Sequence, residues 1–392
     1  MLRSYKYRIY PTGDQIKLIE QTFSACRLVY NLALEVKISA YKQHQINLSA
    51  FSLCRQLVEL KRDHEWLHEV DSQALVASVI RIESAFKNFF RNAGYPKFKS
   101  KKGIQSFQCS YKGRKIDFNN ELLTITKIKN IPIRISRKFE GKVKRIIISR
   151  VPSGKYFVSI LVDNEIHQPT KAPIDIQKTI GIDLGLKDLA ILSDGTKFTN
   201  PKFLKLSQQR LAVLQKRVCR KKKGSGNRKK AVKRVAIQHE RIANQRKDYL
   251  QKISTKLVRD NQTTTFCVES LSVKTLVKNH RLAQAITDAA WSMFVKMLQY
   301  KCLWNGKSVI EIGTFEPSTK TCSTCKVINE EITLEDRNWT CVSCHATHDR
   351  DVNAAINIKF MGLEKSRRGT SEGPVESRRL RRAKKQEVIV DG

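Results

Sequence analysis

The sequence predicts an α+β protein of several domains, and three observations lead to this prediction. Stretches with the apolar spacing of helices alternate along the chain with stretches that have the pattern of strands. Two of the apolar strands each carry a single acidic residue. Two Cys-x-x-Cys pairs lie near the end of the 392-residue chain, and their spacing is typical of a structural zinc site.

The first half of the chain is predicted to combine strands and helices. Residues 1–10 alternate apolar and basic side chains as in a short strand, and a Pro-Thr pair then opens a helix. Helical spacing continues over residues 15–90, enough for about four helices. Strands follow over 106–162, with a hairpin turn at 152–155, and a linker covers 167–173.

The second half is predicted to hold short apolar strands separated by helices. We expect a strand at 179–186 followed by a hairpin, basic helices over 207–258 with a break at 224–227, a strand at 264–269, a helix at 288–304 and a strand at 309–312. From residue 366 onward the chain is basic and short of apolar residues, so a disordered tail is expected there.

The composition indicates a polyanionic partner. Lysine and arginine total 74 against 36 aspartates and glutamates, which gives a net charge of +38. Such a surplus repels itself in a compact chain, and nucleic acid is the partner that best neutralises it. A membrane surface is the competing explanation, but the sequence has no run of about 18 apolar residues. The single, scattered cysteines and the start without an apolar signal core predict a cytoplasmic protein.

Three acidic residues are candidates for a catalytic metal site. Asp183 lies in an apolar strand, Glu269 ends another, and Asp351 begins an alanine-rich helical segment. Taken singly, each has a structural explanation as a solvated strand-end acid or a helix N-cap. Together they match the layout of an RNase H-like site, where carboxylates hold Mg²⁺ or Mn²⁺ ions that clamp the attacking water and the leaving oxygen of a phosphodiester.

The cysteine pairs predict a second metal site of another kind. Four thiolates close the coordination of a zinc ion, so this site is expected to be structural and not catalytic. It would rigidify the segment that leads to Asp351. His345 and His348 lie close enough in sequence to substitute as ligands. The predicted zinc ligands are Cys322, Cys325, Cys341 and Cys344.

Basic residues that are predicted to bind nucleic acid cluster in two places. One is the helical pair, where charges of nearly one sign would repel each other unless they meet phosphates, although a solvated surface explains many charge runs. The other is the basic loop at 94–102, which is interleaved with aromatic residues. The candidate contacts are Arg217, Arg220, Lys221, Lys222, Lys223, Arg228, Lys229, Lys230, Lys97 and Lys99.

Short motifs occur in a fixed order along nearly the whole chain. They are YRIYPT at 7–12, CRLVYN at 26–31, GYPKFKS at 94–100, GIDLGL at 181–186, VE at 268–269, PSTKTCSTC at 317–325 and DRDVNAAINI at 349–358. This ordered set resembles the TnpB (OrfB) family of transposon-encoded proteins, which look like ancestors of the type V CRISPR effectors. One departure is Lys326, which stands where the family often has glycine.

The resemblance implies an RNA-guided DNA endonuclease. A transposon-derived guide RNA would pair with one strand of a double-stranded DNA target, beside a short target-adjacent motif that the protein reads. It also implies that Asp183, Glu269 and Asp351 are the RuvC acids that bind Mg²⁺ or Mn²⁺, with Asp349 as the close rival for the third role. Two alternatives remain, a nuclease-inactive RNA-guided repressor and an accessory transposase protein.

The resemblance further implies an architecture. Residues 1–12 and 104–175 would form a split β-barrel wedge domain, and residues 13–103 a helical recognition domain inserted in it. An RNase H-like (RuvC) α/β core would comprise 176–315 and 346–363, interrupted by a zinc ribbon at 316–345 and followed by a disordered basic tail at 364–392. We expect one protein per guide RNA, no membrane partner, and association with the prokaryotic nucleoid during activity.

Overall fold

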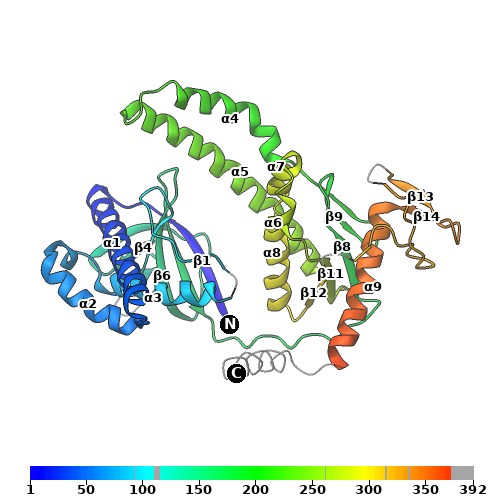
Figure 1. Ribbon diagram of the computed structural model, residues 1–392, viewed down its shortest axis with the longest axis horizontal. Helices are drawn as coiled ribbons and strands as arrows, with labels where there is room; N and C mark the ends of the chain where they lie inside the picture. Colours follow the sequence, from blue (N-terminus) through cyan, green and yellow to red (C-terminus); the bar gives the residue numbers. More distant parts are fainter. Residues whose placement is uncertain (92, 110–114, 261, 314–315, 334–335, 372–392) are drawn as a thin grey trace. The chain divides into compact units, whose positions relative to one another are not determined.

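The computed structural model describes residues 1–91, 93–109, 115–260, 262–313, 316–333 and 336–371, and the chain divides into two compact units (Figure 1). The N-terminal unit comprises residues 1–167 together with 232–237, and the C-terminal unit comprises the remainder. None of the described helices is long and apolar enough to cross a membrane.

The N-terminal unit contains a seven-stranded antiparallel sheet in the order β2-β6-β7-β1-β5-β4-β3. The predicted hairpin at 152–155 is confirmed, because it joins β6 to β7. The pairings within the described residues leave β2 and β3 at the two ends, so closure into a barrel stays a prediction. The strands are β1 (Leu2–Ile9), β2 (Gln105–Cys109), β3 (Lys115–Asp117), β4 (Leu122–Ile125), β5 (Ile128–Arg134), β6 (Lys142–Arg150) and β7 (Tyr156–Asp163).

Helices pack on this sheet and share its core. They are α1 (Gly13–His44), α2 (Ala50–Asp63) and α3 (Ser72–Phe89), with a 3-10 turn at Glu65–His68. The predicted helix start is confirmed by a capping box, in which Thr12 and Gln15 each accept the other's backbone N–H. Phe23 of α1 lies 5.5 Å from Phe107 of β2, centroid to centroid, within one apolar cluster. The segments predicted as recognition helices and wedge strands therefore share one hydrophobic core.

The C-terminal unit is built on a five-stranded mixed sheet in the order β10-β9-β8-β11-β12. Strands β8, β11 and β12 run parallel, while β9 and β10 continue the sheet as an antiparallel hairpin. The strands are β8 (Thr179–Asp183), β9 (Asp188–Leu192), β10 (Lys197–Thr199), β11 (Thr265–Glu269) and β12 (Ser308–Ile312), close to the predicted strand positions.

Helices cover both faces of this sheet (Figure 1). On one face, residues such as Ile182 and Val268 pack with Leu250 and Phe294 from the covering helices. On the opposite face, α9 (Arg350–Ser371) lies along β8 and β11, and its Ile358 packs with Cys267. The other helices are α4 (Phe203–Cys219), α5 (Gly226–Arg259), α6 (Val273–Leu276), α7 (His280–Ala289) and α8 (Trp291–Trp304).

The structure differs from two helix predictions. The single helix expected over 288–304 is divided at Ala290, whose φ of 54° is left-handed. The carboxylate of Asp288 accepts hydrogen bonds from the Leu204 backbone N–H and the Arg246 guanidinium, and these tertiary contacts hold the end of α7 in place. The tail predicted to begin at residue 364 instead starts as a continuation of α9 to Ser371, and residues 372–392 lie outside the described chain.

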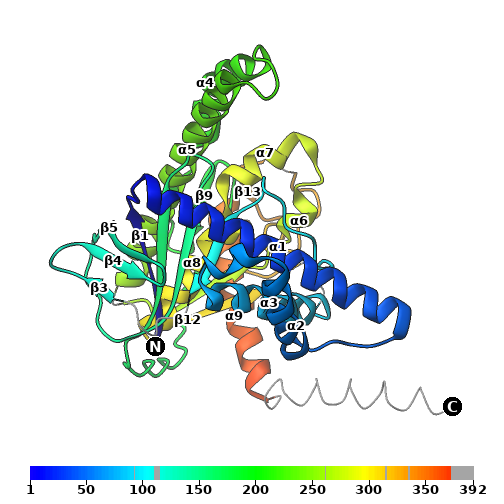
Figure 2. The same ribbon diagram turned by 90° about the vertical axis from the view of Figure 1, so that its left-hand side faces the viewer.

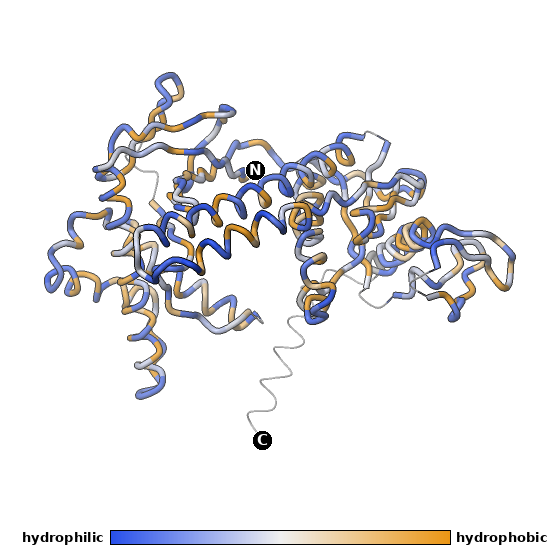
Figure 3. The backbone as a smooth tube through the Cα atoms, turned by 90° about the horizontal axis from the view of Figure 1, so that it is seen from above, coloured by the Kyte–Doolittle hydropathy of each residue, from blue (hydrophilic) through white to orange (hydrophobic). Residues whose placement is uncertain are grey.

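Helices α4 and α5 run side by side and are joined by a tight loop (Figures 1 and 2). The predicted break at 224–227 is confirmed, since Gly224 has a φ of 85° and the Ser225 hydroxyl accepts the Arg228 backbone N–H at the start of α5. Much of this pair is drawn in the hydrophilic colour in Figure 3, with apolar positions at intervals. We refer to α4, α5 and their loop as the basic hairpin.

A small subdomain separates β12 from α9, where the zinc ribbon was predicted. It contains the two-stranded hairpin β13 (Asn338–Thr340) and β14 (Thr347–Asp349). Its buried apolar cluster consists of only Cys322, Ile332, Trp339 and Cys341 among the described residues. A core of this size supplies little stability by itself, so a metal cross-link would contribute much of the order of this subdomain.

Candidate active site and metal centre

The geometry of the sheet brings Asp183 and Glu269 together. Strands β8 and β11 are adjacent and parallel, with Ile182 opposite Val268. Side chains alternate between the two faces of a strand. Since Ile182 and Val268 point into the core beneath α5 and α8, the next residues point to the face that α9 covers. The two acids therefore lie beside each other on that face.

Two glycines allow α9 to approach this face closely. A Cβ on Gly362 would lie 2.3 Å from the sulfur of Cys267 in β11, and one on Gly181 would lie 1.9 Å from the Ala355 carbonyl oxygen. No other residue fits at such distances. The close approach sets the start of α9, and with it Asp351, near the ends of β8 and β11.

The two acids at the start of α9 have different partners. The Asp349 carboxylate accepts the backbone N–H groups of Asp351 and Val352, each at 3.1 Å, and pairs with Lys197 at 2.5 Å. Asp349 thus caps the helix. Asp351 pairs with Arg337 at 3.0 Å and with Arg350 at 3.1 Å. This difference favours Asp351 over Asp349 as the third acid of the site.

The charges of Glu269 and Asp351 act on the third candidate acid, Asp183. Burial, and after it the charges of Glu269 and Asp351, raise the pKa of Asp183 to about 7, against the opposing charge of Arg350. Burial also raises the pKa of Glu269. Among the described residues only the four cysteines bring three or more potential ligand atoms within 4.8 Å of one another. The three acids therefore line one site without forming a compact ligand cluster.

Three polar residues at this site were not predicted from the sequence. The Ser318 hydroxyl donates a hydrogen bond to Glu269 Oε1 at 2.8 Å. The side-chain amides of Asn353 and Asn357 bond to the backbone between Ser318 and Ser323. The available signal was the pair of asparagines four residues apart, which places both on one face of a helix.

A cavity of about 300 Å³ opens beside Glu269. Its wall includes Leu184, after β8, and the α8 residues Trp291 and Lys296. The Trp291 indole N–H donates to the Gly185 carbonyl oxygen at 3.2 Å and so fixes the loop that follows Asp183. Of the three candidate acids, Glu269 lines this cavity and Asp183 and Asp351 do not.

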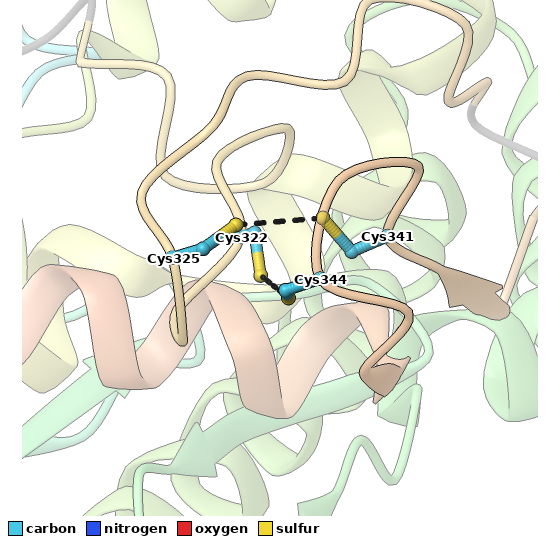
Figure 4. A group of neighbouring side chains, drawn as sticks. All are labelled: Cys322, Cys325, Cys341 and Cys344. Carbon is cyan, nitrogen blue, oxygen red and sulfur yellow. Dashed lines mark hydrogen bonds between the residues drawn. The ribbon is translucent and has the colours of Figure 1, made fainter.

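The four cysteines converge from two loops (Figure 4). Their sulfurs lie within 4.8 Å of one another, with Cys325 to Cys341 at 3.5 Å and Cys322 to Cys344 at 3.7 Å. A tetrahedral zinc ion with Zn–S bonds of about 2.3 Å needs sulfur–sulfur separations of about 3.8 Å. The arrangement therefore fits zinc. Backbone N–H groups of Cys344 and Ser343 lower the pKa of Cys341 to about 6, which favours the thiolate that binds metal.

The histidines near the cysteines have distinct positions. The Nε2 of His348 lies 3.1 Å from the sulfur of Cys322, and its ring lies 4.7 Å from that of Trp339. His348 therefore lies within hydrogen-bond distance of one of the predicted zinc ligands. His345 occupies a left-handed turn with a φ of 59°, and Lys326 occupies the matching turn after the first pair with a φ of 68°.

The predicted nucleic-acid contacts lie mostly in exposed positions on the basic hairpin, but two have internal roles. The guanidinium of Arg228 donates to the carbonyl oxygens of Val218 and Lys221, so it ties the two helices together. The ammonium of Lys99 lies 3.8 Å from the centre of the Tyr30 ring, and burial followed by the charge of Arg81 lowers its pKa to about 8. The exposed candidates are Arg217, Arg220, Lys221, Lys222, Lys223, Lys229, Lys230 and Lys97.

The chain thus combines three neighbouring candidate acids with a cluster of four cysteines whose geometry fits zinc. Three family models match the chain: "Probable transposase" of OrfB_IS605 over residues 159–280, the TNB domain of Cas12f1-like proteins over 291–358, and the "Helix-turn-helix domain" of OrfB_IS605 over 1–45. In this structure residues 1–45 form a strand and one long helix, so the last match reflects sequence and not helix-turn-helix geometry.

Relatives match over almost their full lengths. A Streptomyces pristinaespiralis protein named "Putative RNA-guided DNA endonuclease" is 42% identical, with 95% of this chain and 92% of the relative covered. A protein of Escherichia coli K12 with the same description, InsQ, is 30% identical, with 92% of each chain covered. The chain belongs to the TnpB (OrfB) family of transposon-encoded proteins, which confirms the resemblance predicted from its motifs.

Solved structures show the same fold at low identity. A Cas12f1 protein, determined in complex with single guide RNA and target DNA, aligns with a TM-score of 0.58 at 14% identity, covering 92% of this chain and 98% of that one. The mini-RNA-guided endonuclease CRISPR-Cas_phi3 aligns with a TM-score of 0.50 at 8% identity, covering 93% and 92%. The mixed α+β fold of this chain therefore matches the fold of these two proteins.

Proposed function

We propose that this protein is an RNA-guided DNA endonuclease that hydrolyses DNA phosphodiester bonds beside a short target-adjacent motif. The observation that carries the proposal is the convergence of Asp183, Glu269 and Asp351 at the end of one sheet. Its relatives named as RNA-guided DNA endonucleases, 42% and 30% identical over nearly the whole chain, support the same activity.

The arrangement of the sheet supports an RNase H-like (RuvC) core. In the sheet order an antiparallel hairpin precedes three parallel strands, and the acids stand at the ends of β8 and β11 and at the start of the covering helix α9. Such a site collects ligands from three separate elements, as the bridging of two cations requires. The zinc subdomain is inserted between β12 and α9, within this core.

The donor set fits hard divalent cations. Carboxylate oxygens suit Mg²⁺ or Mn²⁺, and the mutual repulsion of the three acids would be relieved by positive charge. When bound, the cations would activate water and stabilise the leaving oxygen of the phosphodiester. The protein's own contribution is to orient the carboxylates: Ser318 holds Glu269, and Arg337 and Arg350 hold Asp351.

The remaining parts have supporting roles in this proposal. Zinc bound by the four cysteines would order the subdomain ahead of α9. The exposed cations of the basic hairpin would contact the phosphates of guide RNA or target DNA. The fold likeness to a Cas12f1 protein solved with guide RNA and target DNA supports these partners. We further propose one protein per guide RNA, acting in the prokaryotic cytoplasm and at the nucleoid.

The test uses the full-length protein purified with its native transcript. The complex is given plasmid libraries with random bases beside a guide-matched target, in Mg²⁺. We expect cleavage at targets with one flanking motif, and Asp183→Ala should bind but not cleave. Lys178→Ala, in the same unit but before β8, serves as an active control. Guided binding by wild type without cleavage would instead indicate a repressor, and strand transfer without RNA would indicate a transposase.

A further inference from the structure

We infer that Ser318 is a positioning residue for Glu269, and that helix α9 holds Ser318 in place through Asn357. The inference rests on the proposed nuclease function, in which Glu269 binds a divalent cation. It adds a residue outside the three acids whose task is to fix one of them.

The contact between Ser318 and Glu269 is short and sheltered. The hydroxyl donates to Glu269 Oε1 at 2.8 Å, and Ser318 is 3% exposed. The terminal torsion of a glutamate is broad and weakly restrained. A hydrogen bond to one oxygen fixes the plane of the carboxylate and leaves Oε2 available to a cation. Hydrogen bonds of this kind behind a metal ligand raise metal affinity because they hold the ligand in its binding geometry.

The position of Ser318 is itself set by helix α9. The Asn357 side-chain N–H group donates to the carbonyl oxygens of Ser318, at 2.9 Å, and Thr321, at 2.6 Å. Asn357 is 2% exposed, so a lost bond would leave buried polar atoms without water to replace it. Helix α9 therefore places Asp351 directly and Glu269 indirectly, through Asn357 and Ser318.

The same turn leads into the cysteine site. Asn353, one helical turn before Asn357, donates to the Thr321 carbonyl oxygen and accepts the Ser323 backbone N–H, both at 2.8 Å. Cys322 lies between these two anchored residues. Ser318 and Cys322 thus lie on one turn that α9 anchors through Asn353 and Asn357.

The experiment compares Ser318→Ala with Ser318→Thr, which keeps the hydroxyl, and with Thr319→Ala as a matched control. Within the described chain the Thr319 hydroxyl has no hydrogen-bond partner. The first readout is the Mg²⁺ concentration for half-maximal cleavage by the full protein with its RNA. The second is Mn²⁺ binding to the full-length protein without RNA, measured by electron paramagnetic resonance, with binding by Asp183→Ala subtracted. Zinc content and melting temperature accompany both.

We expect Ser318→Ala to raise the half-maximal Mg²⁺ concentration and weaken Mn²⁺ binding by about 10–100-fold, with zinc content retained. Ser318→Thr and Thr319→Ala should stay near wild type. The double variant Ser318→Ala/Asn357→Ala should bind Mn²⁺ no more weakly than Asn357→Ala alone, since both act through one path. That shared path runs from Asn357 of α9 through Ser318 to Glu269, as the inference states.

Unchanged metal dependence in Ser318→Ala would overturn the inference. So would weakened Mn²⁺ binding that Ser318→Thr fails to restore, or losses from Ser318→Ala and Asn357→Ala that simply add. Failure of the proposed function has a different signature, because wild type would then not cleave at any Mg²⁺ concentration. The Mn²⁺ measurement would still decide the role of Ser318 in that case.

Discussion

Gly181 of β8 lies directly against Ala355 of α9, where a Cβ on the glycine would stand 1.9 Å from the Ala355 carbonyl oxygen. It would also stand 2.7 Å from the Lys359 backbone nitrogen. Sheet and helix are therefore in backbone contact two residues before Asp183. This contact sets the distance between the strand that carries the first acid and the helix that begins at the third.

Gly181→Ala should therefore disturb both stability and cleavage. The methyl group meets backbone atoms that cannot rotate away, so we expect a loss of about 1–3 kcal/mol in the free energy of unfolding. Gly226→Ala is the control, because its Cβ would have nothing within 4 Å, and it should be neutral or stabilising by about 0.4–1 kcal/mol. Denaturant unfolding of both variants measures the difference, and equal midpoints would contradict the backbone contact.

Asp183→Asn should stabilise the protein in Mg²⁺-free buffer while abolishing cleavage. Asp183 has a folded pKa of about 7 against 3.8 for the ordinary group. Its contribution to stability is present below pH 3.8 and is lost as the pH rises through 7, because folding disfavours the charged carboxylate. Asparagine removes that charge.

The expected gain in unfolding free energy is about 1–3 kcal/mol at pH 8, shrinking as the pH falls toward 4. Thermal unfolding of wild type and variant across this range provides the measurement. A gain that is independent of pH would show that the charge of Asp183 is not its source.

Lys326→Gly should stabilise the cysteine subdomain. Lys326 holds a left-handed φ of 68°, a conformation that costs a non-glycine residue about 1 kcal/mol. Glycine loses the contact of the ammonium with the Phe360 ring, 4.6 Å away, so Lys326→Ala is the matched control. In the zinc-loaded protein, the free energy of unfolding of Lys326→Gly should be about 0.5–1 kcal/mol higher than that of Lys326→Ala. Thermal unfolding measures this difference. Equal stabilities would indicate that the turn relaxes.

Exposed lysines of the basic hairpin should contribute to nucleic-acid binding and not to the packing of its helices. Replacing Lys221, Lys222 and Lys223 by alanine removes three exposed cations without touching the helix contacts. We expect weaker nucleic-acid binding and a decrease of about 2–3 in the slope of log affinity against log salt. Filter binding over a salt series measures that slope, and an unchanged slope would exclude these lysines from phosphate contact.

Arg228→Ala should behave differently from the triple lysine variant. Its guanidinium bonds to the Val218 and Lys221 carbonyl oxygens, so its loss should loosen the hairpin loop. Faster amide hydrogen exchange at the end of α4 is the expected result. Lys229→Ala, at the next position on an exposed face, should leave exchange unchanged.

The sequence was most informative where local pattern and chemistry coincide. Apolar runs that end in a single acid predicted β8 and β11 and their candidate acids together. The cysteine spacing predicted the sulfur cluster. These signals are local, because strand alternation and ligand spacing depend on residues that are close in the chain.

The features that the sequence did not indicate depend on contacts between residues that are far apart in the chain. Ala290 has no turn preference, and its left-handed geometry arises from contacts of α7 with α4 and α5. Lys99 resembled a surface cation until its packing on Tyr30 was visible. Ser318 and Glu269 are 49 residues apart, and only the folded chain places them within hydrogen-bond distance.

The order of the acids along the chain has a consequence during synthesis. Asp183 and Glu269 leave the ribosome well before Asp351, which waits for the cysteine subdomain to be made. Domains generally fold as they emerge, the N-terminal parts first. A nascent chain can therefore complete most of its N-terminal unit while its acidic centre still lacks the third carboxylate. The candidate site therefore stays incomplete until the cysteine subdomain and the start of α9 have been synthesised.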